Sequence, residues 1–154
     1  MALEQENWES RDMRYIWHPA AQMKDYEALP PMVIARAKGV WLYDVHGKKY
    51  LDIISSWWCN LFGHCNPIIN QAVKEQIDNL EHVIFANFSN EAAIRLAEAL
   101  AKIVPKGLAK FHFNDNGSAA VEAALKMCFQ YHLQTGHPER QKFMCLSEGY
   151  HGET

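Results

Sequence analysis

Two adjacent residues of this 154-residue sequence, Gly117 and Ser118, have the types and the position that an anion site requires. They stand where a helix is expected to begin, and a helix N-terminus presents unpaired backbone amides and about half a positive charge. Glycine lets an anion approach that backbone closely, and the serine hydroxyl adds one more donor. The pair is compatible with a phosphate site, but taken by itself it favours an ordinary turn with a capping residue. The motifs of a nucleotide P-loop and of a hydrolase nucleophile elbow are absent.

Tyr150 and His151 form a second candidate, in a loop that is expected to follow a strand. An aromatic ring beside an anion site can stack on a flat molecule, so this pair favours a planar, phosphorylated ligand. The alternative is an aromatic residue that only covers the edge of a sheet.

A third candidate is the tryptophan pair Trp57 and Trp58. Tryptophan suits the wall of a pocket because it combines an apolar face with one N–H donor. Packing in a core or an interface is the other interpretation, and it is preferred for Trp58. The nearby Cys59, His64 and Cys65 have no spacing typical of zinc ligands, so no metal site is expected.

A βαβ unit is expected to position the first two candidates. Alternating apolar residues predict a strand over Leu108 to Phe113, a helix opens at Ser118, and an apolar run predicts a second strand over Lys142 to Ser147. Parallel strands of such a unit release their loops at the same edge of the sheet. The turn at 114–118 and the loop at 148–152 should therefore be neighbours.

The rest of the chain, residues 1–105, shows local signals for four elements. Residues 1–31 are predicted to be irregular, and a β-hairpin is predicted to pair 39–45 with 49–54. One helix is predicted from Asn66 to about Leu80, and another from about Ser89 to a stop at Pro105.

Composition excludes several classes of protein. Hydrophobic residues make up 49% of the chain and charged residues 21%, which is typical of a globular protein. The formal charge of −3 leaves no basic excess for nucleic acid or anionic lipid. No signal peptide and no apolar run of membrane-spanning length is apparent, so a cytoplasmic protein is expected. The cysteines are expected to be free thiols: Cys59, Cys65, Cys128 and Cys145.

Six segments resemble the class III aminotransferases, enzymes of fold type I that use pyridoxal 5′-phosphate (PLP). They are, in chain order, Ile16–Pro19, Ser55–Trp58, Glu81–Val83, Asp115–Glu122, Gln130–His132 and Gly149–Thr154. The Gly-Ser and Tyr-His-Gly elements are similar across the family. The Trp-His-Pro and Ser-Ser-Trp-Trp elements resemble those of members in biotin biosynthesis, which convert 8-amino-7-oxononanoate to 7,8-diaminononanoate.

The resemblance implies an α/β fold. Residues 1–60 would be an N-terminal arm with a β-rich small-domain segment, and residues 61–154 the start of the large, PLP-binding domain, incomplete here. It implies that Gly117 and Ser118 hold the cofactor phosphate and that Tyr150 stacks on the pyridine ring and borders the substrate. It also implies that Trp57 lines the substrate pocket and that the full-length protein is a homodimer.

The sequence departs from the family at two points. Ala20 and Ala21 stand where the family often has an aromatic residue that reaches the substrate, so the amino donor stays open between S-adenosylmethionine and lysine. In the family, the lysine that forms the Schiff base with the cofactor comes after the position of Thr154. The expectation is an N-terminal fragment without a catalytic residue, inactive and poorly folded alone, with Lys126 on a helix surface. Two alternatives are another class III ω-amino-acid aminotransferase and a non-catalytic binder of a phosphorylated ligand.

Overall fold

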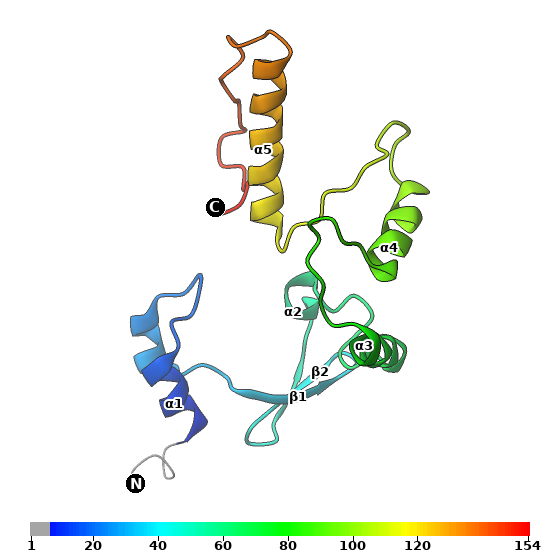
Figure 1. Cartoon of the computed structure of the whole chain (residues 1–154). Helices are drawn as coiled ribbons and strands as arrows, with labels where there is room; N and C mark the ends of the chain where they lie inside the picture. Colours follow the sequence, from blue (N-terminus) through cyan, green and yellow to red (C-terminus); the bar gives the residue numbers. More distant parts are fainter. Residues whose placement is uncertain (1–6) are drawn as a thin grey trace. The chain divides into compact units, whose positions relative to one another are not determined.

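The computed structural model describes residues 7–154, which form two compact units (Figure 1). The first unit ends at His82, and the second comprises Val83–Thr154. The predicted division at residue 60 concerns the domains of a longer fold and stays a prediction.

The first unit contains a three-stranded antiparallel sheet in the order β1-β2-β3. β1 (Ile34–Lys38) pairs with β2 (Trp41–Asp44), and β2 pairs with β3 (Lys49–Leu51). The pairing of β2 with β3 confirms the predicted hairpin. Gly47 in its turn has a φ of +84°, a left-handed conformation that glycine adopts without steric cost.

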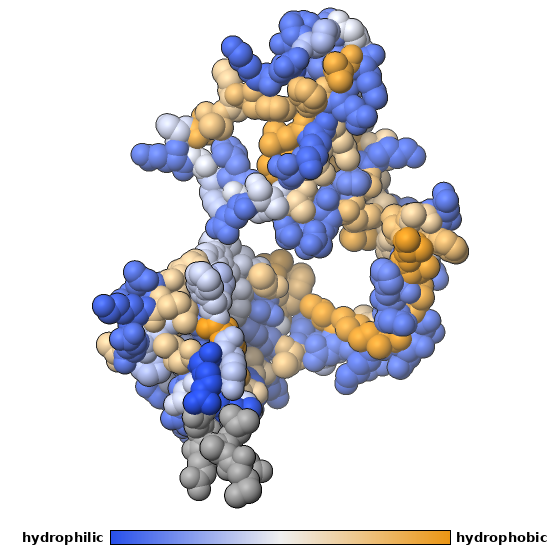
Figure 2. Space-filling model, turned by 60° about the vertical axis from the view of Figure 1, so that its left-hand side comes forward, coloured by the Kyte–Doolittle hydropathy of each residue, from blue (hydrophilic) through white to orange (hydrophobic). Residues whose placement is uncertain are grey.

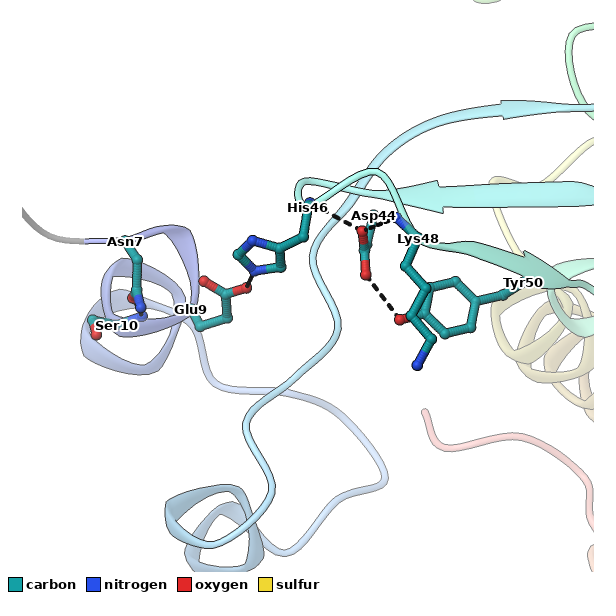
Figure 3. Close-up of polar contacts among 7 residues, drawn as sticks. All are labelled: Asn7, Glu9, Ser10, Asp44, His46, Lys48 and Tyr50. Carbon is teal, nitrogen blue, oxygen red and sulfur yellow. Dashed lines mark hydrogen bonds and ion pairs between the residues drawn. The ribbon is translucent and has the colours of Figure 1, made fainter.

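The carboxylate of Asp44 holds this hairpin turn together. It accepts hydrogen bonds from the amides of His46 (2.9 Å) and Lys48 (2.8 Å) and from the hydroxyl of Tyr50 (2.8 Å; Figure 3). Asp44 is only 7% exposed. Burial by itself raises the pKa of Asp44, but the hydrogen bonds from Tyr50, Lys48 and His46 outweigh it and the net pKa is lowered.

The prediction of irregular chain in residues 1–31 is wrong for the described part, because α1 (Trp8–Tyr15) and a short 3₁₀ helix (Met23–Glu27) lie there; residues 1–6 lie outside the described residues. Asn7 caps α1 by accepting a hydrogen bond from an amide of its first turn (Figure 3). Glu9 of α1 lies 2.6 Å from Nε2 of His46, so a hydrogen bond joins the helix to the hairpin turn. That partner is 37 residues away, which local sequence patterns do not reveal.

The three longer helices confirm the sequence prediction. They are α3 (Pro67–Asn79) in the first unit, and α4 (Glu91–Ala101) and α5 (Gly117–Gln134) in the second. An asparagine side chain caps each helix by accepting from a backbone amide of the first turn: Asn66, Asn90 and Asn116. On α5, the amine of Lys126 lies 3.5 Å from the carboxylate of Glu122, and Lys126 is exposed as expected.

The two strands predicted around α5 do not form in the described chain. Segments 108–113 and 142–147 have no ladder partner, so the prediction of a parallel βαβ unit is wrong here. A strand needs a hydrogen-bonded neighbour, whereas a helix satisfies its backbone internally. After α5 the chain instead turns back and runs beside the helix toward its first turn (Figure 1).

The chain exposes far more surface than a closed domain does. A compact monomer of this length exposes roughly 8,000 Å², whereas this chain exposes 13,992 Å². No hydrophobic side chain among residues 7–154 is buried, and Figure 2 shows apolar side chains, in orange, on the surface. The apolar faces of the helices therefore lack a cover within the described chain. None of the described helices has the length and apolar character needed to cross a bilayer.

Candidate functional site

The start of α5 presents unused backbone donors. Asn116 satisfies two amides of the first turn, because its side chain accepts from Ala119 (2.8 Å) and its carbonyl from Ala120 (3.1 Å). The amides of Gly117 and Ser118 have no acceptor within residues 7–154. They lie at the positive end of an 18-residue helix, where an anion is stabilised.

The hydroxyl of Ser118 adds a third donor. The backbone N–H of Glu153, 35 residues further along, donates to Ser118 Oγ at 3.0 Å. Because the oxygen accepts this bond, the hydroxyl proton stays available for another group. Two amides and one oriented hydroxyl therefore meet at the start of α5, and this donor set suits the oxygens of a phosphate.

Gly152 makes this contact possible. Its φ is +111°, and a Cβ atom at this position would lie 2.7 Å from Ser118 Oγ and 2.9 Å from Ser118 Cα. Side chains rarely adopt that conformation, and those distances are shorter than real Cβ contacts, so the close approach requires glycine. The prediction that the turn at 114–118 and the loop at 148–152 are neighbours is confirmed, although the parallel strands behind it do not form.

Tyr150 lies in the same loop and is 79% exposed. The Tyr150 ring takes part in none of the aromatic ring pairs found within residues 7–154. An exposed aromatic face two residues before Gly152 is available for a flat ligand. Its stacking role stays a prediction.

Trp57 belongs to the first unit, on a turn with unusual handedness. All four residues of α2 (Ser55–Trp58) have positive φ angles: 50°, 48°, 64° and 65°. The turn is therefore left-handed, a conformation that costs a residue other than glycine roughly 1–2 kcal/mol. Four such residues in succession need support from elsewhere in the fold.

Asp52 supplies that support. Its Oδ1 accepts from the amide of Ser56 at 2.9 Å, and its Oδ2 accepts from Ser56 Oγ and from His64 Nε2, both at 2.7 Å. The side chains of Asp52 and His64 are 4% and 13% exposed. The amide of Ser56, followed by His64 and the Ser56 hydroxyl, lowers the pKa of Asp52 from 3.8 to about 2.

Sequence reasoning missed Asp52 and its partner. An aspartate ahead of Ser55 and Ser56 is a signal for a side chain that bonds nearby amides, but nothing local pointed to His64. The ring of His64 contacts the carboxylate of Asp52. Within residues 7–154, no three candidate ligands gather in a way that could hold a metal ion.

The contribution of Asp52 to stability is expected to decline in acid. Its folded-state pKa of about 2 lies below the ordinary 3.8, so the contribution is complete above pH 3.8 and is lost as the pH falls through about 2. The measurement is the difference in free energy of unfolding between the protein and its Asp52→Asn variant. We expect a constant difference above pH 3.8 and a shrinking one below it. A difference that stays constant down to pH 2 would contradict the shifted pKa.

The sequence of this chain is similar to a known protein family and to individual enzymes. Residues 22–154 match the family model described as Aminotransferase class-III. The chain is 46% identical to the adenosylmethionine-8-amino-7-oxononanoate aminotransferase of Geobacter sulfurreducens over 143 residues, which are 93% of this chain and 32% of that protein.

Solved structures agree with the sequence comparison. A crystal structure of the enzyme with the same name from Methanocaldococcus jannaschii has a TM-score of 0.91 and 44% identity, and the match covers 95% of this chain and 33% of that one. An ω-transaminase from Pseudomonas jessenii in complex with PMP has a TM-score of 0.90 and 29% identity over 97% of this chain and 33% of that one. The chain thus spans about a third of the length of the relatives that it matches.

Proposed function

This chain belongs to the class III aminotransferase family, and we propose that it supplies the N-terminal third of an adenosylmethionine–8-amino-7-oxononanoate aminotransferase. Its fold is part of the type I fold of the PLP-dependent transaminases. The observation that carries the proposal is the contact of Ser118 with Gly152 and Glu153, because it brings a second segment to the donors at the start of α5 that would hold a phosphate.

The cofactor of this family is PLP. The donors at the start of α5 fit its phosphate, since the amides of Gly117 and Ser118 are unpaired within residues 7–154 and the Ser118 hydroxyl has a proton to give. When bound, PLP supplies a carbonyl carbon that exchanges amino groups and a ring that withdraws electrons from it. The proposed role of this chain is to bind the cofactor. Gly117 and Ser118 would hold the phosphate, and the exposed side chain of Tyr150 would cover the cofactor ring and exclude water.

Trp57 is proposed to line the pocket for 8-amino-7-oxononanoate. Trp57 is 65% exposed in the described chain, and its ring offers an apolar face to a nine-carbon chain. The donor is proposed to be S-adenosylmethionine, which the names of the relatives support. The lysine that carries the cofactor is proposed to lie in the remaining two thirds of the enzyme.

We also propose that the complete enzyme is a cytoplasmic homodimer. The uncovered apolar faces of both units support further packing, against the rest of the chain and against a second copy. A second candidate function is amino transfer from another ω-amine, because the ω-transaminase of Pseudomonas jessenii matches this chain with a TM-score of 0.90.

One experiment separates these functions. The gene is read beyond codon 154, and its complete product is purified and assayed on 8-amino-7-oxononanoate with S-adenosylmethionine, lysine or a simple ω-amine as donor. We expect 7,8-diaminononanoate to form with S-adenosylmethionine. Turnover of ω-amines with other acceptors alone would favour the second candidate. A product that binds no PLP would overturn the proposal.

A further inference from the structure

We propose that Asp52 and His64 are positioning residues for the substrate pocket, because they hold the left-handed turn that carries Trp57. The inference rests on the proposed function, in which Trp57 borders the acceptor substrate. Neither Asp52 nor His64 needs to touch the substrate to act in this way.

The backbone bonds of the turn do not select its handedness. The amide of Trp58 donates to the carbonyl of Ile54 at 2.8 Å, and the amides of Cys59 and Asn60 donate to the carbonyl of Ser55. A right-handed turn forms bonds of the same kind without crowding each Cβ against a carbonyl oxygen. A contact from outside the turn must therefore favour the left-handed form.

Asp52 makes that contact. The amide of Ser56 donates a hydrogen bond to the side chain of Asp52, which lies outside the turn, and the Ser56 hydroxyl donates to the same carboxylate. These two bonds fix both the backbone and the side chain of Ser56, in the middle of the left-handed segment. The side chain of Asp52 is 4% exposed, whereas Ser56, which it binds, is exposed.

His64 ties this carboxylate to the sheet. Its ring binds Asp52 Oδ2 at 2.7 Å, and its backbone pairs with Gly39, which directly follows β1. The two backbone bonds of that pair measure 2.8 and 2.9 Å. A Cβ atom on the neighbouring Gly63 would lie 3.1 Å from Gly39 Cα, so the two backbones are in close contact. The turn is thus attached to the sheet through His64 and Asp52.

The direction of the Trp57 ring depends on this attachment. The ring of Trp58 is its aromatic neighbour, edge to face at 6.5 Å, and belongs to the same turn. With 65% of Trp57 exposed, packing against the described chain does not fix the ring. Handedness decides the direction in which each side chain leaves the backbone, so relaxation to a right-handed turn would move Trp57 away from its pocket.

The test uses the complete enzyme and separates binding from chemistry. We expect Asp52→Ala to raise KM for 8-amino-7-oxononanoate about tenfold, with kcat and the cofactor absorbance little changed, because one apolar wall is misplaced. Adding Ser56→Gly to Asp52→Ala is expected to recover about threefold in KM, because glycine adopts the left-handed conformation freely. That recovery is not expected if Asp52 acts only on general stability. Asp78→Ala, which removes an exposed carboxylate from α3, is the matched control.

Two further variants keep the outcome decisive. Asp52→Asn and Ser56→Ala each keep part of the contact, and each is expected to raise KM by about threefold even if Asp52→Ala does not fold. Trp57→Ala tests the proposed function itself. If Trp57→Ala raises KM and the Asp52 and Ser56 variants do not, the positioning role is overturned while the proposed function stands. If Trp57→Ala leaves KM unchanged, the role of Trp57 fails and this inference fails with it.

Discussion

Replacing Gly152 by alanine in the complete enzyme is expected to weaken PLP binding by about 100-fold. The new Cβ atom would lie 2.7 Å from Ser118 Oγ, and neither side can give way without moving backbone. The loop would have to withdraw, and the amide of Glu153 would leave the Ser118 hydroxyl. The phosphate would then lose an oriented donor, and Tyr150 would be displaced along with the loop.

Gly107→Ala is the matched control for this experiment. Gly107 has a φ of +101°, close to the +111° of Gly152, but a Cβ atom there would meet nothing within 4 Å. In both variants, alanine at a positive φ destabilises the backbone. Only Gly152→Ala also brings the new Cβ atom into collision with Ser118. Titration of each apoenzyme with PLP, followed by absorbance, gives the dissociation constants. Equal losses in both variants would mean that the contact with Ser118 has no part in cofactor binding.

Replacing Ser118 by alanine is expected to weaken PLP binding by about 10- to 100-fold, which corresponds to a lost hydrogen bond to a charged group. The same variant should bind pyridoxal, which lacks the phosphate, as well as the unmodified enzyme does. The reason is that, in the proposed site, the hydroxyl of Ser118 contacts only the phosphate group, which pyridoxal lacks. Inorganic phosphate should also compete less well with PLP in this variant.

Ser147→Ala serves as its control, because Ser147 is an exposed serine of the same unit and its hydroxyl forms no hydrogen bond within residues 7–154. The measurement is the ratio of the affinities for PLP and pyridoxal in each variant. We expect this ratio to change only for Ser118→Ala. If Ser118→Ala weakens both ligands equally, Ser118 supports the fold of the site and does not contact the phosphate.

The helices could be predicted because their signals lie close together in the chain. Asn66, Asn90 and Asn116 each cap a helix through an amide two or three residues away, and helix bonds join residues four apart. Local signals could not establish whether the strands predicted at 108–113 and 142–147 would form. Alternation shows that a segment suits a sheet, but a strand forms only where a second segment supplies its hydrogen bonds.

The residues at the start of α5 illustrate what the sequence by itself determined. The residue types and their spacing in the sequence placed Gly117 and Ser118 at a helix N-terminus, and placed Tyr150 in the loop that returns to that N-terminus. Those are local properties of the chain, set by the donors that a helix start leaves unpaired and by the freedom of glycine.

The tertiary structure alone decided the rest. It set the contact of Ser118 with Gly152 and Glu153, across 34 and 35 positions, and the left-handed turn that Asp52 and His64 hold. Each of these arrangements opposes a local preference, either by bringing two backbones unusually close or by reversing the handedness of a turn. The contact of Glu153 with Ser118 joins residues 35 apart, and that of His64 with Asp52 joins residues 12 apart. Such contacts supply free energy that overrides a local preference, and they exist only once the chain has folded.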